Sequence, residues 1–263
     1  MAEIIVIAAN KGGVGKTSLV TNLAGAIITR KPKKKILIVD MDGQGNAGVA
    51  FGINPNTLDK TVYDVLINKS SVDETKIEVI NGIDLLPANQ NMDVWEMEVL
   101  TNNDNKASPF SHLKNAIDPI KHLYDYILID TPPSLGLTTG NALVATNKVI
   151  IPFVPETFAI LGLTRVVETM NDFTQRVNPK LKLAGVVGTM VDQRTTLHNE
   201  MMQQARKYCF QHKLHMFETV IPRSIRFANS TAYNGKPATL TDANNNIVSA
   251  YFDLSVEVVS LND

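Results

Sequence analysis

Cysteine is almost missing from this sequence, since Cys209 is the only one in 263 residues. One cysteine cannot form an internal disulfide, which excludes disulfide-stapled secreted domains and favours the reducing cytoplasm. The chain also lacks any apolar run of about 18 residues, the length that spans a bilayer, so we expect a soluble protein without a membrane partner. The net charge is only −1, so any nucleic-acid binding must come from a local basic patch.

Apolar strand-like runs alternate with helical patterns along the whole chain, and no repeat or flexible linker divides it. Several runs are continuous Ile, Val and Leu, as in strands buried on both faces. The alternation predicts an α/β fold, a doubly wound, mostly parallel sheet flanked by helices, in a single domain of residues 1–263. The expected strands are Ile4–Ala9, Lys35–Asp40, Gly82–Pro87, Tyr126–Asp130, Lys148–Pro152, Leu183–Met190 and Met216–Val220. The expected helices are Lys16–Arg30, Thr61–Asn68, Pro109–Leu123, Ile160–Val177, Leu197–His212 and Asn244–Val259.

Two segments fit this scheme poorly. Asn89–Ser108 is polar and rich in Asn, and we expect a short helix near Trp95 followed by a mobile loop. Arg30–Lys35 holds five basic residues around Pro32, which is typical of a solvated turn between a helix and a strand.

A glycine-rich segment joins the first expected strand to the first expected helix. Three glycines let the backbone approach a ligand closely, and their N–H groups at a helix N-terminus form an anion site. Lys16 would reach the β- and γ-phosphates of a nucleotide, and the Thr17 hydroxyl would bind Mg²⁺. Asn10 stands where the standard phosphate-loop pattern has its first glycine, so the segment matches the deviant form with a second lysine. The expected nucleotide-binding residues are Lys11, Gly12, Gly13, Val14, Gly15, Lys16, Thr17 and Ser18.

Two further expected strands end in aspartate. Asp42 follows the strand Lys35–Asp40, and Asp130 closes the strand Tyr126–Asp130. Parallel strands end at the same edge of a sheet, so both carboxylates should lie beside the phosphate loop. There they would hold Mg²⁺ directly or through water. The predicted metal site is therefore Thr17, Asp42 and Asp130.

This set of motifs resembles the ParA/MinD superfamily, and the Gln44–Asn46 element resembles ParA-type DNA partition ATPases within it. The resemblance spans residues 4 to 237 in the family's order, although 89–120 carries none of the motifs. Family members usually have Pro where Gly43 stands, so a looser turn is expected here. The segments that carry the resemblance are Lys11–Thr17, Asp40–Asn46, Asp130–Pro133, Thr189–Thr195, Ile221–Arg226 and Asn234–Pro237.

The resemblance implies roles for individual residues. Lys11 would be the signature lysine that crosses a homodimer interface to the partner's ATP, and Asp42 would position the attacking water. Pro222 and Ser224 match a segment that contacts adenine, with Ser224 where relatives often have Asn. The catalytic residues implied are Lys11, Lys16 and Asp42, in a chain that hydrolyses ATP to ADP with Mg²⁺.

The resemblance also implies partners. ParA-type ATPases bind double-stranded DNA without sequence preference as ATP-bound dimers, and a ParB-like centromere-binding protein stimulates their hydrolysis. Plasmid or chromosome segregation on the nucleoid is the function that this implies. No segment that could be a helix-turn-helix precedes the phosphate loop, so we do not expect operator binding. The expected DNA contacts are Arg194, Arg223, Arg226 and Lys236, which would neutralise phosphates.

Three alternatives remain at this stage. A membrane-cycling ATPase resembling MinD would need a basic C-terminal helix, whereas Ser255–Asp263 has two acids and no base. An iron–sulfur reductase would need two cysteines per chain for a shared cluster. The third alternative is a nucleotide-dependent adaptor with negligible turnover. Only Asp42, as a residue for hydrolysis, argues against it, and a single-turnover ATPase assay would distinguish it from an ATPase.

Overall fold

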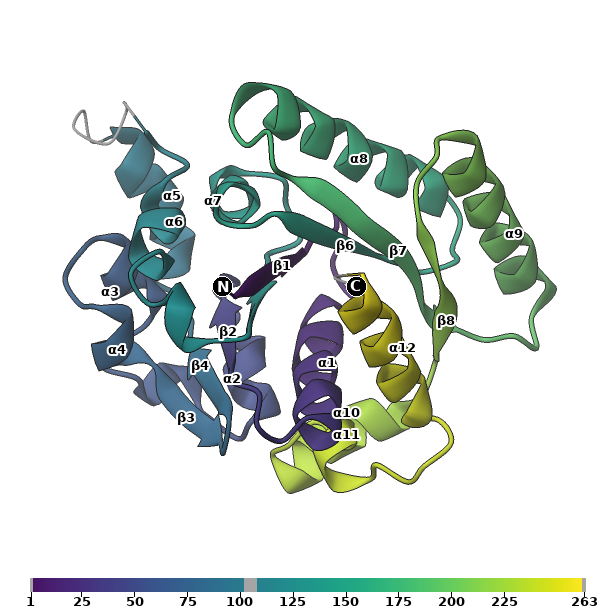
Figure 1. The fold of residues 1–263 in the computed structure, drawn as a ribbon, viewed down its shortest axis with the longest axis horizontal. Coiled ribbons are helices and arrows are strands. Elements are labelled where there is room, and N and C mark those ends of the chain that lie inside the picture. The colour runs from purple at the N-terminus through teal and green to yellow at the C-terminus, as the bar shows by residue number, and fades with distance from the viewer. Residues whose placement is uncertain (1, 102–107, 262–263) are drawn as a thin grey trace.

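A single eight-stranded sheet runs through the centre of the molecule (Figure 1). The structure, a computed structural model, describes residues 2–101 and 108–261. The strand order is β3-β4-β2-β5-β1-β6-β7-β8, and only the β3–β4 pair is antiparallel among these neighbours. The doubly wound α/β fold is therefore confirmed. The strands are β1 (Glu3–Ile7), β2 (Ile36–Asp40), β3 (Ile77–Ile80), β4 (Ile83–Leu86), β5 (Tyr126–Asp130), β6 (Lys148–Phe153), β7 (Lys182–Val191) and β8 (Met216–Pro222).

Helices cover both faces of this sheet, and the side chains of each strand alternate between them. Val6 packs with one hydrophobic cluster, while its neighbours Ile5 and Ile7 pack with the other. In Figure 1, α1 and α12 lie together on one face, and α7 and α8 lie across the other. The helices are α1 (Lys16–Arg30), α2 (Asn46–Ala50), α3 (Val62–Leu66), α4 (Val72–Thr75), α5 (Met92–Thr101), α6 (His112–Ile117), α7 (Leu137–Ala145), α8 (Ala159–Arg176), α9 (Thr196–Gln211), α10 (Ile225–Asn234), α11 (Ala238–Thr241) and α12 (Ser249–Ser260), with short 3₁₀ turns at Pro55–Thr57 and Lys121–Leu123.

The expected strands all exist, and the structure adds β3. This strand pairs antiparallel at the edge of the sheet and is only half-buried, so it lacks the continuous apolar run of the central strands. The Asn81-Gly82 dipeptide between β3 and β4 is a hairpin signal that would have revealed it. The helix expected at Asn244–Val259 was wrong at its start, because α12 begins at Ser249.

Several helical predictions also need correction. The helix predicted for Pro109–Leu123 is divided into α6 and a separate 3₁₀ turn. The short helix expected near Trp95 is confirmed as α5, whereas the loop expected after it falls largely on residues 102–107, outside the described residues. Helix α7 was missed because it is buried on every side and so has no polar face to show a helical period. The short helices α2, α4, α10 and α11 were also missed.

The fold places the carboxyl ends of three strands together. Ile7 at the end of β1 pairs with Asp130 at the end of β5, and Asp40 at the end of β2 pairs with Asp130 on the other side. β1 pairs with β5 on one side and with β6 on the other, so the order of the strands reverses at β1. Ligands of open α/β sheets bind at such a switch point. No helix in the described part of the chain is long and apolar enough to cross a membrane.

Candidate functional site

The glycine-rich loop lies at this switch point, between β1 and α1. Gly13 and Gly15 have φ angles of 71° and 84°, in the left-handed region that glycine adopts without strain. Gly15 is the N-cap of α1, and no side chain caps that helix end. The first N–H groups of α1 are therefore free to bind an anion, and the helix dipole favours negative charge there.

The two lysines of this loop have different surroundings. Lys16 is 7% exposed, and its Nζ donates to the carbonyl oxygen of Lys11 at 3.2 Å. Burial lowers the pKa of Lys16, while the nearby Asp130 and Asp42 carboxylates act in the opposite direction. The Lys11 side chain is 57% exposed and forms an ion pair with Glu156. Lys16 is thus a buried cation inside the loop, and Lys11 lies on the surface.

Thr17 and Asp130 meet beneath the loop. The Thr17 hydroxyl donates to Asp130 Oδ2 at 2.5 Å, and Asp130 is fully buried. Burial raises the pKa of Asp130 to about 7, although Thr17 and Lys16 counteract this. The other carboxylate oxygen, Oδ1, is buried without a hydrogen-bond partner among the described residues.

This arrangement fits a magnesium ion. A buried carboxylate oxygen without a partner needs a donor or a cation, and Mg²⁺ prefers oxygen ligands such as hydroxyl and carboxylate. The described residues contain no cluster of three or more His, Cys, Asp or Glu side chains that could form an all-protein metal site. Mg²⁺ is usually held by one or two carboxylates together with a nucleotide's phosphates.

Asp42 stands in the loop that joins β2 to α2. Its Oδ1 accepts the Gln44 N–H at 3.0 Å, which fixes the side chain locally. Gly43 follows directly, and a Cβ atom there would come within 2.6 Å of Asp93 Oδ1. The nearest backbone atom, the Asn89 carbonyl oxygen, is at 3.6 Å, so a side chain at position 43 would require only that the Asp93 carboxylate move.

Two adjoining cavities extend from the loop. The first, of about 660 Å³, is lined by the glycine-rich loop, Asp42 and Pro133. The second, of about 1010 Å³, is lined by Pro222 and Ser224, the predicted adenine segment, and by Tyr251. The two cavities share the lining residues Gly15, Thr17, Ser18, Asn46 and Met190. A phosphate chain and a nucleoside could therefore occupy neighbouring compartments.

Sequence reasoning missed several residues that line these cavities. Helix α5 contributes Asp93 and Glu96 to the first cavity, from the segment that carried no family motif. Its buried residues Met92, Trp95 and Val99 follow helical spacing, which indicates a helix but does not mark Asp93 or Glu96 as cavity residues. Tyr251, whose hydroxyl is 3.0 Å from Ser18 Oγ, comes from the distant α12.

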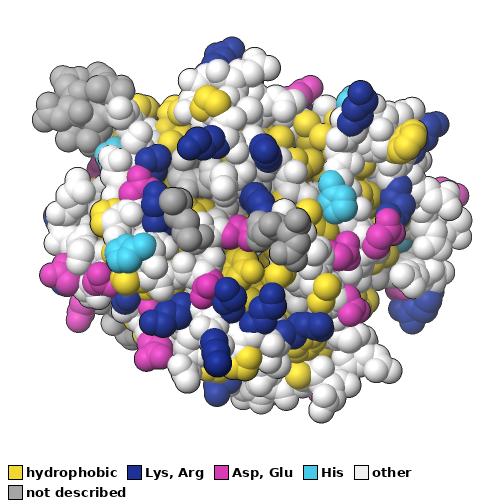
Figure 2. Space-filling view, viewed as in Figure 1, with side chains coloured by type: hydrophobic (Ala, Val, Ile, Leu, Met, Phe, Trp, Pro, Cys, Tyr) yellow, Lys and Arg dark blue, Asp and Glu magenta, His cyan; other side chains and the backbone are white. Residues whose placement is uncertain are grey.

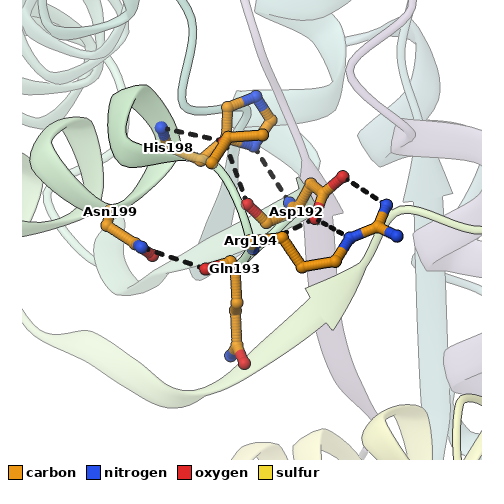
Figure 3. Close-up of polar contacts among 6 residues, drawn as sticks. Asp192, Gln193, Arg194, His198 and Asn199 are labelled. Carbon is orange, nitrogen blue, oxygen red and sulfur yellow. Dashed lines mark hydrogen bonds and ion pairs between the residues drawn. The ribbon is translucent and has the colours of Figure 1, made fainter.

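Two of the four predicted DNA contacts are held by acids of their own chain. Figure 3 shows the Arg194 guanidinium beside Asp192, with Nε and Nη2 donating to the two carboxylate oxygens at 2.8 and 2.7 Å. Arg226 forms an ion pair with Asp242 at 2.7 Å. Arg223 and Lys236 are exposed and form no ion pair with any described residue.

A separate basic group lies on another part of the surface. Figure 2 shows Lys and Arg side chains gathered around α1, where the turn Arg30–Lys35 leads into β2. Lys34 pairs with Asp125, while Lys33 is exposed. Because this turn precedes β2, it lies at the edge of the sheet opposite the glycine-rich loop. It agrees with the expected solvated turn.

The sequence matches known proteins over its whole length. Residues 2–183 match a family described as an AAA domain. Over 260 residues, the chain is 35% identical to the chromosome partitioning protein ParA of Myxococcus xanthus, covering 98% of this chain and 88% of that protein. The chain belongs to the ParA-type ATPases. The resemblance inferred from the motifs is thereby confirmed.

Solved structures agree with this membership. A plasmid partition protein from Borrelia burgdorferi bound to AMPPNP is 26% identical, with a TM-score of 0.79 and full coverage of both chains. Cobyrinic acid a,c-diamide synthase from Mycobacterium smegmatis with ADP and magnesium is 28% identical, with a TM-score of 0.82, covering 97% of this ParA-type chain and 93% of its own. Proteins of this fold therefore include enzymes other than partition ATPases, so function must be argued from the site.

Proposed function

We propose that this ParA-type chain binds ATP with Mg²⁺ and hydrolyses it to ADP and phosphate. The observation that carries this proposal is the buried contact of Thr17 with Asp130 beneath the glycine-rich loop, with Asp42 near enough to affect the pKa of Lys16. The N–H groups of the loop and the Lys16 ammonium would bind the β- and γ-phosphates. The neighbouring cavity, with Pro222 and Ser224, would take the adenosine.

Thr17, Asp130 and Asp42 are the residues that would hold the magnesium ion, directly or through water. Bound there, the ion would neutralise charge on the phosphate oxygens. The Asp42 carboxylate would orient a water molecule toward the γ-phosphorus. The water oxygen would form a bond to the γ-phosphorus as the bond from that phosphorus to the bridging oxygen of ADP breaks. The water would lose a proton to the released phosphate or to solvent.

ATP would also act as the switch for dimerisation. Lys11 is exposed beside the phosphate cavity, so its ammonium could reach the nucleotide of a second copy. It must first leave Glu156, an exposed pair of the kind that contributes about 0–1 kcal/mol. Each protomer would then supply a cation to the other's ATP, and hydrolysis would release the dimer.

The ATP-bound homodimer would bind double-stranded DNA without sequence preference, as a partition ATPase of the nucleoid in the cytoplasm. Arg223 lines the second cavity, Lys236 follows the end of α10, and both side chains are exposed. Arg194 and Arg226 could also bind DNA phosphates if they left Asp192 and Asp242. A ParB-like centromere-binding protein would stimulate hydrolysis. A small DNA-binding protein encoded beside this chain would be the first partner to test.

Three measurements on the purified protein test this proposal. Phosphate release with ATP and Mg²⁺ should be slow alone and faster with the ParB-like protein and DNA. Size-exclusion chromatography with light scattering should show a dimer with ATP and a monomer with ADP. Mobility shifts on two unrelated duplexes should appear only with ATP. Nucleotide binding without single-turnover hydrolysis would favour the adaptor instead, and DNA binding that ignores the nucleotide would remove the switch.

A further inference from the structure

Asp40 is a buried carboxylate to which the proposed mechanism gives no role. It closes β2, is 0% exposed, and has no ion-pair partner among the described residues. Its register partner on β5, Asp130, is also fully buried. A buried acid near another buried acid is costly to retain, so its hydrogen bonds matter to the argument.

Both oxygens of Asp40 bind the loop that carries Asp42. Oδ1 accepts the N–H of Asp42 at 3.0 Å, and Oδ2 accepts the N–H of Ala47 at 3.0 Å. One carboxylate thus holds both ends of the 42–47 segment. The second bond reaches the first turn of α2, whose N-cap, Gly45, has no side chain to cap the helix.

The residue before Asp42, Met41, is already joined to β5, because its N–H donates to the Asp130 carbonyl oxygen at 3.0 Å. Asp42 itself has few other contacts. Its carbonyl oxygen accepts the Gly45 N–H at 2.9 Å, and its side chain accepts the Gln44 N–H. Both of these bonds lie within the loop itself, so they fix its local turn but do not join it to the sheet. The bond from Asp40 does join Asp42 to β2.

We propose that Asp40 is a positioning residue for hydrolysis, which anchors the Asp42 loop to the sheet so that the Asp42 carboxylate meets the water that attacks ATP. The inference rests on the proposed role of Asp42. Asp40 itself touches neither nucleotide nor water in this scheme. An error of about 1 Å in placing a catalytic group can reduce the rate about 100-fold, so the anchor would affect turnover more than binding.

The test is Asp40→Asn, which keeps the size of the side chain. Asparagine has only one acceptor oxygen, whereas the N–H groups of Asp42 and Ala47 each need an acceptor. We expect kcat for ATP hydrolysis to fall about 10- to 100-fold, with the Kd for ATP within about threefold of the original protein. Asp125→Asn is the matched control, because Asp125 also accepts a backbone N–H, from Lys35 at 2.9 Å, at the opposite edge of the sheet. It should leave kcat unchanged.

A double variant separates positioning from general damage. If Asp40 acts through Asp42, Asp40→Asn should have almost no effect on kcat in an Asp42→Ala background, since the group it positions is gone. A further multiplicative loss in the double variant would overturn the proposal, as would an unchanged kcat in Asp40→Asn. If Asp42→Ala alone hydrolyses ATP normally, the proposed role of Asp42 fails first. Should Asp40→Asn not fold, Asp40→Ser supplies the same comparison.

Discussion

Replacing Lys16 with alanine should remove most of the affinity for ATP. The Lys16 side chain is 7% exposed, and its ammonium lies inside the glycine-rich loop, where phosphates would bind. Truncating one member of a buried, hydrogen-bonded charge pair costs about 2 to 5 kcal/mol. Since about 1.4 kcal/mol is a factor of ten, Kd should rise by about 30-fold to several thousand-fold.

Lys11→Ala provides a matched control in the same loop. The Lys11 side chain is 57% exposed and pairs with Glu156, so its removal costs the monomer only about 0–1 kcal/mol. Its effect on the Kd of a monomer for ATP should stay below about fivefold. The two lysines therefore give a large and a small effect from the same chemical change.

The assay is titration of a fluorescent ATP analogue, at protein concentrations that keep the chain monomeric. A second titration with ADP and a chelator separates the effect of Lys16 on the phosphates from its effect on magnesium, because Lys16 also lowers the pKa of Asp130, a proposed magnesium ligand. Thermal melts verify that both variants fold. Equal losses in the two variants, or a Lys16→Ala affinity within threefold of the original, would refute the assignment of Lys16 to the phosphates.

Three further predictions follow from the site. Asp42→Ala should bind ATP and accumulate as a dimer, while Lys11→Ala should bind ATP and remain a monomer; light scattering with ATP checks both. Arg223→Ala should weaken binding equally on two unrelated duplexes, whereas Lys33→Ala, at the opposite edge, should not; mobility shifts compare them. The pKa of Asp130, about 7, lies above its ordinary value, so the protonated carboxyl contributes to the free energy of unfolding. That contribution is full below about pH 4 and is lost as the pH rises through 7. Nucleotide-free unfolding experiments should show this loss, and Asp130→Asn should reduce it.

The central strands were predictable because burial on both faces makes their sequences continuous runs of Ile, Val and Leu. The apolar residues of strands β1, β2 and β5 are only 0–9% exposed. No polar residue interrupts β2 or β5 before the final aspartate, and β1 is wholly apolar after Glu3. Edge strand β3 has one exposed face and only four residues, so the same signal is too short there. A strand is therefore recognisable in the sequence where all of its residues share one environment.

The residues that line the site were predictable only where they follow one another in a single sequence motif. The loop from Lys11 to Thr17 forms a phosphate site from consecutive residues, and its pattern can therefore be found in a sequence. Asp93, Glu96 and Tyr251 come from helices that pack beside that loop, and nothing local marks them as neighbours of a ligand. Their place depends on tertiary packing between distant segments.

The number of basic residues in the sequence overstates how many are free to neutralise DNA phosphates. Four basic residues per protomer would suggest eight phosphates neutralised by a dimer, and a slope of log K against log salt of about −7. Arg194 and Arg226 already pair with Asp192 and Asp242, so each must give up an acid to gain a phosphate. Counterion release then comes mainly from Arg223 and Lys236, and the expected slope falls to about −4. Ion pairing within the chain, which composition cannot show, would thus set how strongly salt opposes the proposed DNA binding.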